Sequence, residues 1–407
     1  MARPSVMVTG MGVVSAIGCS VGAFFHALVS GRSGVRPLAG EGGLPVASVE
    51  FDVKAHFPLA HARTLDRFAQ LGLVAVDEAV LQSKLQKADL QGPRVGVYFG
   101  SGLGGATAID DAYRSFFAPE GRVNPMTVVL TMANAAAAHI SIRYAIRGPS
   151  LTYSVACASS AVAIGEAFRA IRDGYIDVAI AGGAESIITP GSLASWKAMR
   201  VLATPDASHP EAACRPFSAD RTGLVVGEGA GALVLESSEH AKRGGRAPLA
   251  EIAGYGIASD ATNLAKPDAD GQAQAMSAAL VDAIAQPSDI GYINAHGTAT
   301  PTGDVVETES IRKAFGATAD RIPVSSTKAL HGHLLGASGA VELIAALMAL
   351  RTGTIPPTCH LEERDPQCDL DYVREGARRA RVDAVMSNSF AFGGTNAVLV
   401  ARRASAS

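Results

Sequence analysis

The alternation of apolar and polar positions along the chain predicts a repeated α/β arrangement. Short apolar runs of strand character alternate with longer segments of helical periodicity, which is typical of layered α/β proteins. In the first part of the sequence, strands are expected over residues 5–14, 94–102, 151–156, 177–184 and 231–236. In the second part, they are expected over residues 249–259, 291–296 and 397–402.

Helical periodicity is clearest over residues 159–174 and 338–353, and these two segments resemble each other. Both follow a turn of small residues, both end at glycine, and both precede an apolar strand. The similarity indicates a duplicated α/β unit, with an N-terminal half over residues 1–245 and a C-terminal half over residues 246–407. In this alignment Cys157 falls opposite Gly336, so the two halves present different chemistry at equivalent places.

Composition and charge narrow the classes of protein that the chain can belong to. With 407 residues, 48% of them hydrophobic, the chain can bury a large core. A formal charge of −3 without a basic run gives no reason to expect a nucleic-acid partner. The N-terminus lacks the pattern of a signal peptide, and the most apolar later run, residues 339–350, is too short to cross a membrane and contains Glu342. We therefore expect no membrane span and a cytoplasmic location.

The five cysteines are scattered and form no CxxC pair, which favours free thiols in a reducing compartment over disulfides or a zinc site. Cys157 stands between an apolar stretch and a run of tiny residues. One interpretation is a small buried hydrophobic residue. The other is an exposed nucleophilic thiolate that the N-terminus of the following helix stabilises. This stretch alone leaves both interpretations open.

Three later motifs supply further candidate chemistry. His296 ends a predicted strand and is followed by Thr298 and Thr300, whose hydroxyls suit an amide-bearing ligand. Lys328 and His333 precede the second helix in a segment of small residues. Near the C-terminus, Phe392 is followed by two glycines, which indicates either a simple hairpin corner or a mobile hinge that carries an aromatic plug.

Together these motifs resemble the elongating β-ketoacyl-[acyl-carrier-protein] synthases of the Cys-His-His class. The matching features are Cys157, HGTxTxxGD at 296–304, the Lys328 and His333 segment, and SFxFGGTN at 389–396. The resemblance runs nearly end to end and implies a duplicated thiolase fold in five layers, α/β/α/β/α. It also implies a homodimer, although a heterodimer with a paralogue stays open.

The resemblance implies decarboxylative Claisen condensation of malonyl-carrier protein with an acyl-enzyme thioester. Cys157 would be an exposed, stabilised thiolate that carries the acyl chain. His296 and His333 would stabilise the enolate, and Lys328 would support both histidines. The backbone N–H groups of Cys157 and Phe392 would form the oxyanion hole. Contact with the phosphopantetheine arm, which the acyl carrier protein supplies, is implied for Thr298 and Thr300. The resemblance implies no other required cofactor.

Further matches are less specific. Ile109 and Phe392 match gates of the acyl pocket. Three arginines match basic surface positions that meet the carrier protein: Arg63, Arg67 and Arg200. Five residues match a Na⁺ or K⁺ site seen in some members: Asn294, Glu307, Glu342, Ser387 and Asn388. For the two glutamates, buried structural hydrogen bonding is an equal alternative.

The acyl substrate stays open. Ala391 replaces a more usual glycine, and residues 134–138 are smaller than expected near the acyl pocket. These differences permit either fatty acid synthesis or a related polyketide or polyene pathway. A non-catalytic chain-length or partner subunit of a ketosynthase heterodimer is the alternative function. It is disfavoured because Cys157, His296, Lys328 and His333 are all present.

Overall fold

The computed structural model describes residues 4–404, and ten of the described strands, five from each half, join in one mixed sheet. The first half contributes β1 (Val6–Ser15), β4 (Val95–Gly100), β5 (Ser150–Tyr153), β6 (Val178–Glu185) and β8 (Gly229–Ser237). The second contributes β9 (Ala250–Ser259), β10 (Tyr292–Asn294), β11 (Val324–Ser325), β14 (Ala384–Phe390) and β15 (Thr395–Arg402). All the strands expected from the sequence are present.

The strand order demonstrates the duplication. The first half runs β5-β4-β6-β8-β1, and the second runs β11-β10-β14-β15-β9, so corresponding strands occupy corresponding places. The two halves meet where β1 and β9 pair antiparallel, from Val6 opposite Ile252 to Val8 opposite Ala250. This pairing was not expected from the sequence, and it makes one continuous hydrogen-bonded sheet out of the two repeated units.

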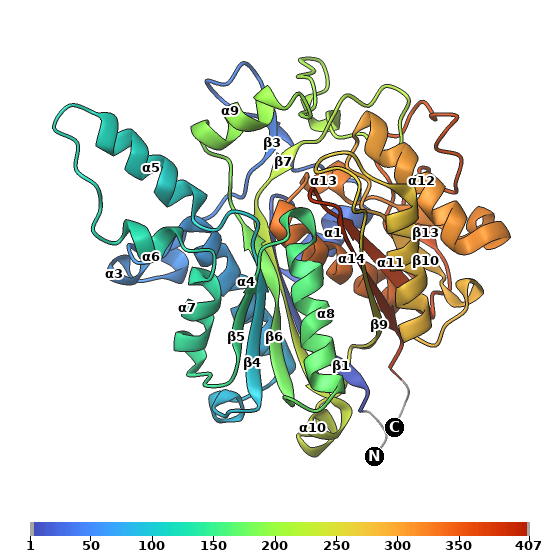
Figure 1. Ribbon diagram of the computed structural model, residues 1–407, viewed down its shortest axis with the longest axis horizontal. Helices are drawn as coiled ribbons and strands as arrows, with labels where there is room; N and C mark the ends of the chain where they lie inside the picture. Colours follow the sequence, from blue (N-terminus) through green and yellow to red (C-terminus); the bar gives the residue numbers. More distant parts are fainter. Residues whose placement is uncertain (1–3, 405–407) are drawn as a thin grey trace.

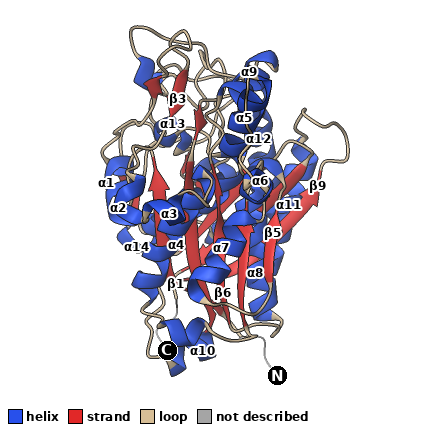
Figure 2. Ribbon diagram, turned by 90° about the vertical axis from the view of Figure 1, so that its left-hand side faces the viewer, coloured by secondary structure: helices blue, strands red, loops and turns tan. Residues whose placement is uncertain are grey.

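Helices form the other layers of the fold (Figures 1 and 2). In the middle, α8 (Ser159–Arg172) and α14 (Ser338–Thr352) pack against each other and against strands of both halves. On the outside, α4 (Arg67–Ser83) and α7 (Ala135–Tyr144) cover the first half, and α11 (Ala269–Asp282) with α12 (Pro301–Phe315) covers the second. The five-layered thiolase-like arrangement expected from the sequence is confirmed.

Small residues allow the two central helices to approach closely. A Cβ on Gly339 of α14 would lie 2.8 Å from the Cβ of Ala161 on α8. α14 is buried on nearly all sides, and its buried positions are small or apolar except for Glu342. The segment Leu335–Thr352 is apolar and long enough to cross a membrane, but 83% of it is buried inside the fold. The packing identifies it as a core helix.

Short 3₁₀ turns precede both central helices. The turn η2 (Ala156–Ala158) leads into α8, and η6 (Leu335–Ala337) leads into α14. Ala156 and Leu335, the first residues of the two turns, share a backbone φ of +46°. This conformation is uncommon for residues with a side chain, and strain of this kind is often found at functional sites. Cys157 and Gly336 therefore occupy equivalent places at the heads of the two helices.

Candidate active site

Cys157 is the residue around which the site is built. It lies in η2 at the head of α8, as expected, but its side chain is buried. Burial raises the pKa of the thiol to about 12, although the Lys328 charge and the Phe392 backbone N–H both act to lower it. The prediction of an exposed, stabilised thiolate is therefore wrong for this conformation. The structure holds Cys157 as a neutral thiol.

His333 is the closest titratable partner of this thiol. Its Nε2 lies 3.1 Å from the Cys157 Sγ. On the other side of the ring, Nδ1 accepts the backbone N–H of Leu335 at 3.3 Å and lies 2.9 Å from the Ser338 hydroxyl. These contacts place the ring proton on Nε2, because Nδ1 is used as an acceptor. Burial holds the pKa of His333 well below its ordinary value, so the ring is neutral.

His296 faces His333 from the end of β10. The two imidazole rings lie edge to face, with their centroids 5.3 Å apart. Glu307 of α12 accepts the backbone N–H groups of His296 and Gly297 at 2.8 and 2.7 Å, which fixes the turn after the strand. Burial, followed by the positive charge of Lys328, holds the pKa of His296 well below its ordinary value.

The three side chains converge, although they are widely separated in the sequence. One ligand-type atom from each of Cys157, His296 and His333 lies within 4.8 Å of the others. In the sequence these three residues stand far apart, which argued against a metal site. In the folded chain they lie together. The cluster offers one sulfur and two Nε2–H groups around a common point.

Lys328 contacts this cluster on the side of His296. It begins α13 (Lys328–His331) and is fully buried, where it forms an ion pair with Glu342 of α14. Its Nζ donates to the His296 carbonyl oxygen at 2.5 Å and lies 3.5 Å from the His296 Nδ1. Since this Nδ1 faces an ammonium donor, the His296 proton is placed on Nε2 as well. The positive charge favours neutral forms of both histidines.

A cavity of about 370 Å³ opens in front of these residues. Thr298 and Thr300 line it together with Cys157, His296 and His333. The hydroxyl oxygens of Thr298 and Thr300 lie 3.0 Å apart, and the Thr300 hydroxyl accepts the Gly303 N–H at 3.2 Å as the N-cap of α12. Thr300 thus has a structural role that the sequence motif did not reveal.

The segment with Phe392 is a hairpin corner, and the mobile hinge stays a prediction. The segment connects the antiparallel strands β14 and β15, and its glycines adopt φ angles of +89° at Gly393 and +77° at Gly394. The Phe392 backbone N–H acts to lower the pKa of the Cys157 thiol. Its ring stacks on Trp196 of α9 (Pro190–Ala198), with the centroids 6.1 Å apart. Both rings line the cavity.

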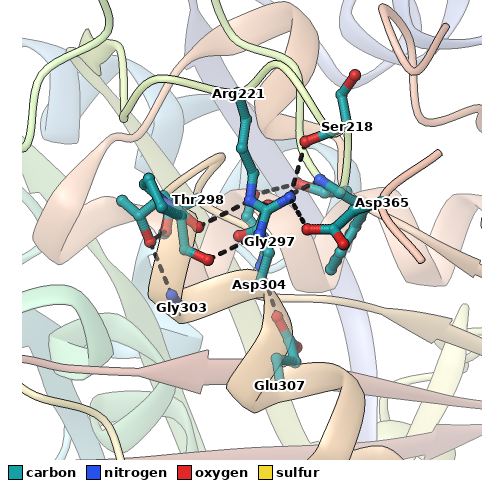
Figure 3. A network of polar contacts seen from close by, with 12 residues as sticks. Ser218, Arg221, Gly297, Thr298, Gly303, Asp304, Glu307 and Asp365 are labelled. Atoms are coloured by element: carbon teal, nitrogen blue, oxygen red, sulfur yellow. Dashed lines mark hydrogen bonds and ion pairs between the residues drawn. The ribbon is translucent and has the colours of Figure 1, made fainter. Parts of the chain in front are cut away.

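Arg221 braces the loop that carries the threonines (Figure 3). Its guanidinium is buried and donates to the carbonyl oxygens of Thr300 and Pro301 at 3.0 and 2.7 Å. It also pairs with Asp365 at 2.7 Å and lies 3.7 Å from Asp304. The arginine therefore ties the first half of the chain to the start of α12 in the second half.

The predicted carrier-protein arginines differ in their surroundings. Arg63 is exposed, and Arg200 is exposed at the rim of the cavity. Arg67 is folded inward, where it forms a two-point ion pair with the buried Glu228 at 2.7 and 2.6 Å and donates to the Val49 carbonyl. Because this guanidinium is bound within the fold, we remove Arg67 from the predicted carrier-protein surface.

Ile109 lies on α5 (Ala106–Phe117), which projects from the body of the molecule in Figure 1. It is 36% exposed and does not line the described cavity with Cys157. It instead belongs to a group of exposed apolar side chains on α5, α6 (Thr127–Thr131), α7 and the edge strand β5. Its role as a gate of the acyl pocket stays a prediction.

The residues predicted for a cation site divide between the two faces of β14 (Ala384–Phe390). Neighbours on a strand point to opposite faces, so Ser387 lies on one face and Asn388 on the other. Asn294 and Ser387 pair across β10 and β14, and Asn388 donates to Glu307 at 3.1 Å. Among the residues that the structure describes, three of their buried oxygens have no hydrogen-bond partner: Asn294 Oδ1, Ser387 Oγ and Asn388 Oδ1. Glu342, the fifth residue, is occupied by Lys328.

Sequence reasoning missed Glu185, a carboxyl group buried at the end of β6. It accepts backbone N–H groups from Gly102 at 2.5 Å, Leu103 at 3.2 Å and Gly336 at 3.0 Å. Burial raises its pKa to about 7. In the sequence, Glu185 stands out only because it ends an apolar strand. Its partners come from both halves of the chain, so the local sequence does not reveal them. Glu185 thus links Gly336, which is the counterpart of Cys157 in the second half, to the first half of the chain.

Comparison with known proteins identifies the family. The model of the β-ketoacyl synthase N-terminal domain matches residues 3–241, and that of the C-terminal domain matches residues 249–362. The chain belongs to the β-ketoacyl synthase family. The resemblance recognised in the sequence is thereby confirmed, and so is the class of enzyme, an acyltransferase that condenses acyl groups.

Two curated relatives illustrate the range of this family. The β-ketoacyl synthase is 40% identical to 3-oxoacyl-[acyl-carrier-protein] synthase 2 of Coxiella burnetii, over 99% of both chains. It is 42% identical to nodulation protein E of Rhizobium leguminosarum bv. trifolii, over 98% of this chain and 99% of the relative.

Solved structures agree in fold. A β-ketoacyl synthase from Burkholderia phymatum matches with a TM-score of 0.92 and 36% identity, over 98% of this chain and 100% of that chain. The ishigamide ketosynthase/chain length factor matches with a TM-score of 0.92 and 33% identity, over 99% and 100%.

Proposed function

We propose that this β-ketoacyl synthase condenses an acyl group held on Cys157 with malonyl-carrier protein. In the first step the Cys157 sulfur attacks the acyl thioester of a carrier protein. The new thioester forms on Cys157, and the thiol proton ends on the leaving phosphopantetheine sulfur. The observation that carries the proposal is the convergence of Cys157, His296 and His333 within 4.8 Å in one cavity.

In the second step the malonyl group loses CO₂ and leaves an enolate on its thioester. The Nε2–H groups of His296 and His333 donate to the enolate oxygen, which requires neutral imidazoles rather than a strong base. The enolate carbon attacks the acyl carbonyl on Cys157, and the carbon–sulfur bond breaks. The products are 3-oxoacyl-carrier protein, CO₂ and, after uptake of one proton, the free Cys157 thiol.

The backbone N–H groups of Cys157 and Phe392 would stabilise the oxyanion that forms on the acyl carbonyl. Such a pair of donors supplies a few kcal/mol in related acyl-transfer reactions. The Phe392 N–H acts to lower the pKa of the Cys157 thiol, which supports this role. Lys328 would act by charge and hydrogen bonding rather than as the base, since Glu342 pairs with its ammonium group.

Substrate delivery would follow from the cavity and its rim. Thr298 and Thr300 line the entrance and suit the amides of the phosphopantetheine arm. Arg63 and Arg200 offer exposed positive charge to an acidic carrier protein. The apolar face on α5 to α7 and β5 would pair with a second subunit, either an identical chain or a paralogue. A cytoplasmic location would suit this reaction and this partner.

For a Na⁺ or K⁺ ion, Asn294 and Ser387 are the candidate ligands. They are register partners on β10 and β14, and each keeps a buried oxygen without a partner among the described residues. Neutral oxygens of amide and hydroxyl groups suit a hard cation. Asn388 lies on the other face of β14, where it binds Glu307, which holds the His296 turn. The ion would stabilise the ends of β10 and β14.

The alternative, a non-catalytic partner subunit, makes a different prediction for Cys157. A synthase acylates Cys157, and its Cys157→Gln variant, which imitates the acyl-enzyme, keeps or increases decarboxylation of malonyl-carrier protein. A partner subunit decarboxylates in neither form. Release of CO₂ from purified wild-type protein, Cys157→Gln and the double variant Cys157→Gln/His333→Ala separates the two functions, since loss of His333 removes one enolate donor.

A further inference from the structure

The two repeated turns, η2 and η6, are held by different contacts. In η2, the first residue of the following helix closes the turn: the Ser159 hydroxyl accepts the Val155 N–H at 2.9 Å and donates to the Ala156 carbonyl oxygen at 2.7 Å. The turn that carries Cys157 is therefore clamped by a serine of its own half.

Ser338 is the equivalent serine at the head of α14, and its hydroxyl has a different partner. It donates to the His333 Nδ1 at 2.9 Å. Within the part of the chain that the structure describes, no hydrogen bond joins this hydroxyl to η6. The second turn therefore lacks the clamp that the first turn has, because its serine orients a histidine instead.

Glu185 supplies a clamp for the second turn from the other half of the chain. Its Oε2 accepts the Gly336 N–H at 3.0 Å and the Gly102 N–H at 2.5 Å. Its Oε1 accepts the Leu103 N–H and the Ser101 hydroxyl, both at 3.2 Å. The side chain is completely buried. The carboxylate thus fixes η6 against the loop that follows β4.

This contact reaches His333 through one residue. Leu335, which precedes Gly336, donates its backbone N–H to the His333 Nδ1 at 3.3 Å. Its φ of +46° is uncommon for a residue with a side chain, and such a conformation persists only where the surroundings hold it. The other ring nitrogen, Nε2, lies 3.1 Å from the Cys157 Sγ. The place of the Glu185 carboxylate therefore sets the place of the His333 ring beside Cys157.

We propose that Glu185 is a positioning residue that acts through Gly336 and Leu335 to hold the His333 ring where its Nε2–H can donate to the enolate oxygen. The inference rests on the proposed function. The role depends on where Oε2 lies, so the length of the side chain matters more than its charge.

Two substitutions separate length from charge. Glu185→Asp keeps the carboxylate but withdraws it by about 1.5 Å, the length of one carbon–carbon bond. Glu185→Gln keeps the length and can present its amide oxygen in the place of Oε2, where it still accepts the Gly102 and Gly336 N–H groups. Its NH₂ group can donate to the Ser101 hydroxyl.

The test compares two rates, each expressed per folded chain. CO₂ release from malonyl-carrier protein is measured with the substitutions placed in the Cys157→Gln protein, and single-turnover acylation is measured with Cys157 present. Glu185→Asp should lower the kcat of CO₂ release about 10- to 100-fold, as expected for a misplaced donor. Its KM should stay unchanged, because Glu185 does not line the cavity. Acylation should fall much less, since Ser159 clamps η2 independently.

Glu78→Asp is the matched control. Glu78 also accepts two backbone N–H groups, from Val13 at 2.9 Å and Val21 at 2.8 Å, and it does not line the cavity. Its shortening should lower the thermal unfolding midpoint and leave both rates unchanged.

Three results would overturn the inference. They are an unchanged CO₂ release in Glu185→Asp, an equal loss of both rates in that variant, and a loss in Glu185→Gln as large as that in Glu185→Asp. The last result would assign the effect to charge, since the Glu185 charge acts to raise the pKa of the Cys157 thiol. If Glu185→Asp does not fold, Glu185→Gln alone decides, because a large loss of CO₂ release in it contradicts the inference. Absence of CO₂ release from Cys157→Gln with Glu185 intact would instead contradict the proposed function itself.

Discussion

Burial sets the protonation of every reactive side chain in the site. It raises the pKa of the Cys157 thiol and lowers the pKa of His296 and His333, so that all three are neutral near pH 7. Lys328, which lies beside these three residues, carries a positive charge and forms an ion pair with Glu342. A decarboxylating site needs neutral donors around an oxygen that becomes negative, and this arrangement supplies them without a strong base.

The histidine pKa values predict that neither imidazole contributes a limb to the pH profile of decarboxylation between pH 6 and 8. An ordinary histidine titrates near 6.5, but both histidines here have lower pKa values, so their proton occupancy does not change in this range. Burial raises the pKa of Glu342 and of Glu185 to about 7, so these carboxyl groups can add a limb of their own. Rates of CO₂ release by Cys157→Gln across this range test the prediction. An acid limb with a midpoint near 6.5 that persists when Glu342 and Glu185 are each replaced by Gln would contradict it.

The unpartnered oxygens predict a cation effect on stability. Addition of K⁺ or Na⁺ should raise the thermal unfolding midpoint relative to choline at equal ionic strength, because an ion that binds only the folded state stabilises it. Ser387→Ala removes one of the oxygens and should weaken this specific shift. Thr152→Val removes an unpartnered hydroxyl outside the site and serves as control. Equal midpoints in all three salts would exclude the ion.

Sequence reasoning found the reactive residues because each belongs to a local motif: Cys157 before a small-residue helix, His296 after a strand, and Lys328 with His333 before the second helix. It missed Glu185 and Arg221, whose partners are distant in sequence. Glu185 binds Gly336, 151 residues away, and Arg221 binds Asp365, 144 residues away. It also misjudged Cys157 as exposed, because burial depends on loops that fold over the helix head.

At the scale of elements, the heads of α8 and α14 are equivalent turns with different chemistry. Cys157 stands at one head, and Gly336 stands at the other. A Cβ at Gly336 would lie 2.5 Å from the Gly102 nitrogen and 2.6 Å from a Glu185 oxygen, so only glycine fits there. The repeat thus provides one site for a nucleophile and one contact that joins the halves.

Gly336→Ala should therefore destabilise the protein by about 1–3 kcal/mol, the usual cost of overpacking a buried position. Gly22→Ala is the matched control, since an added Cβ there meets nothing within 4 Å in the helix α1 (Val21–Val29). That change should stabilise by about 0.5–1 kcal/mol. Denaturant unfolding of both variants gives the comparison, and equal free energies of unfolding would contradict the close contact at Gly336.

At the scale of the whole molecule, the strand β5 forms one end of the ten-stranded sheet and lies within the exposed apolar face. β5 pairs with β4 on one side only, and the exposed side of an edge strand is a template for association with another chain. Leu151 on β5 is 44% exposed, and Phe116 and Phe117 on the neighbouring arm are 63% and 78% exposed. The face suits a subunit interface that continues the sheet.

Leu151→Asp should convert the assembled protein to monomer, as measured by sedimentation velocity, because it places a charge in the apolar interface. Val281→Asp is the control, since Val281 is exposed on α11, away from this face. An unchanged sedimentation coefficient for Leu151→Asp would place the interface elsewhere.

The architecture was predictable to a large extent because the repeat is visible in the two Ala-rich helices and in the strand pattern around them. The pairing of β1 with β9 was not, since three matched residues leave no signal in the sequence. The projecting arm of α5 was not predictable either. Its apolar residues, such as Phe116 and Phe117, would be assigned to a core if composition alone decided.

The most direct test of the account is intact-mass spectrometry of the wild-type protein after incubation with acyl-carrier proteins of different chain length and unsaturation. We expect one acyl adduct per chain, mapped to Cys157 by peptide analysis and absent from Cys157→Ala. An adduct on another cysteine, or none from folded protein with any acyl chain, would contradict the assignment of Cys157 as the nucleophile.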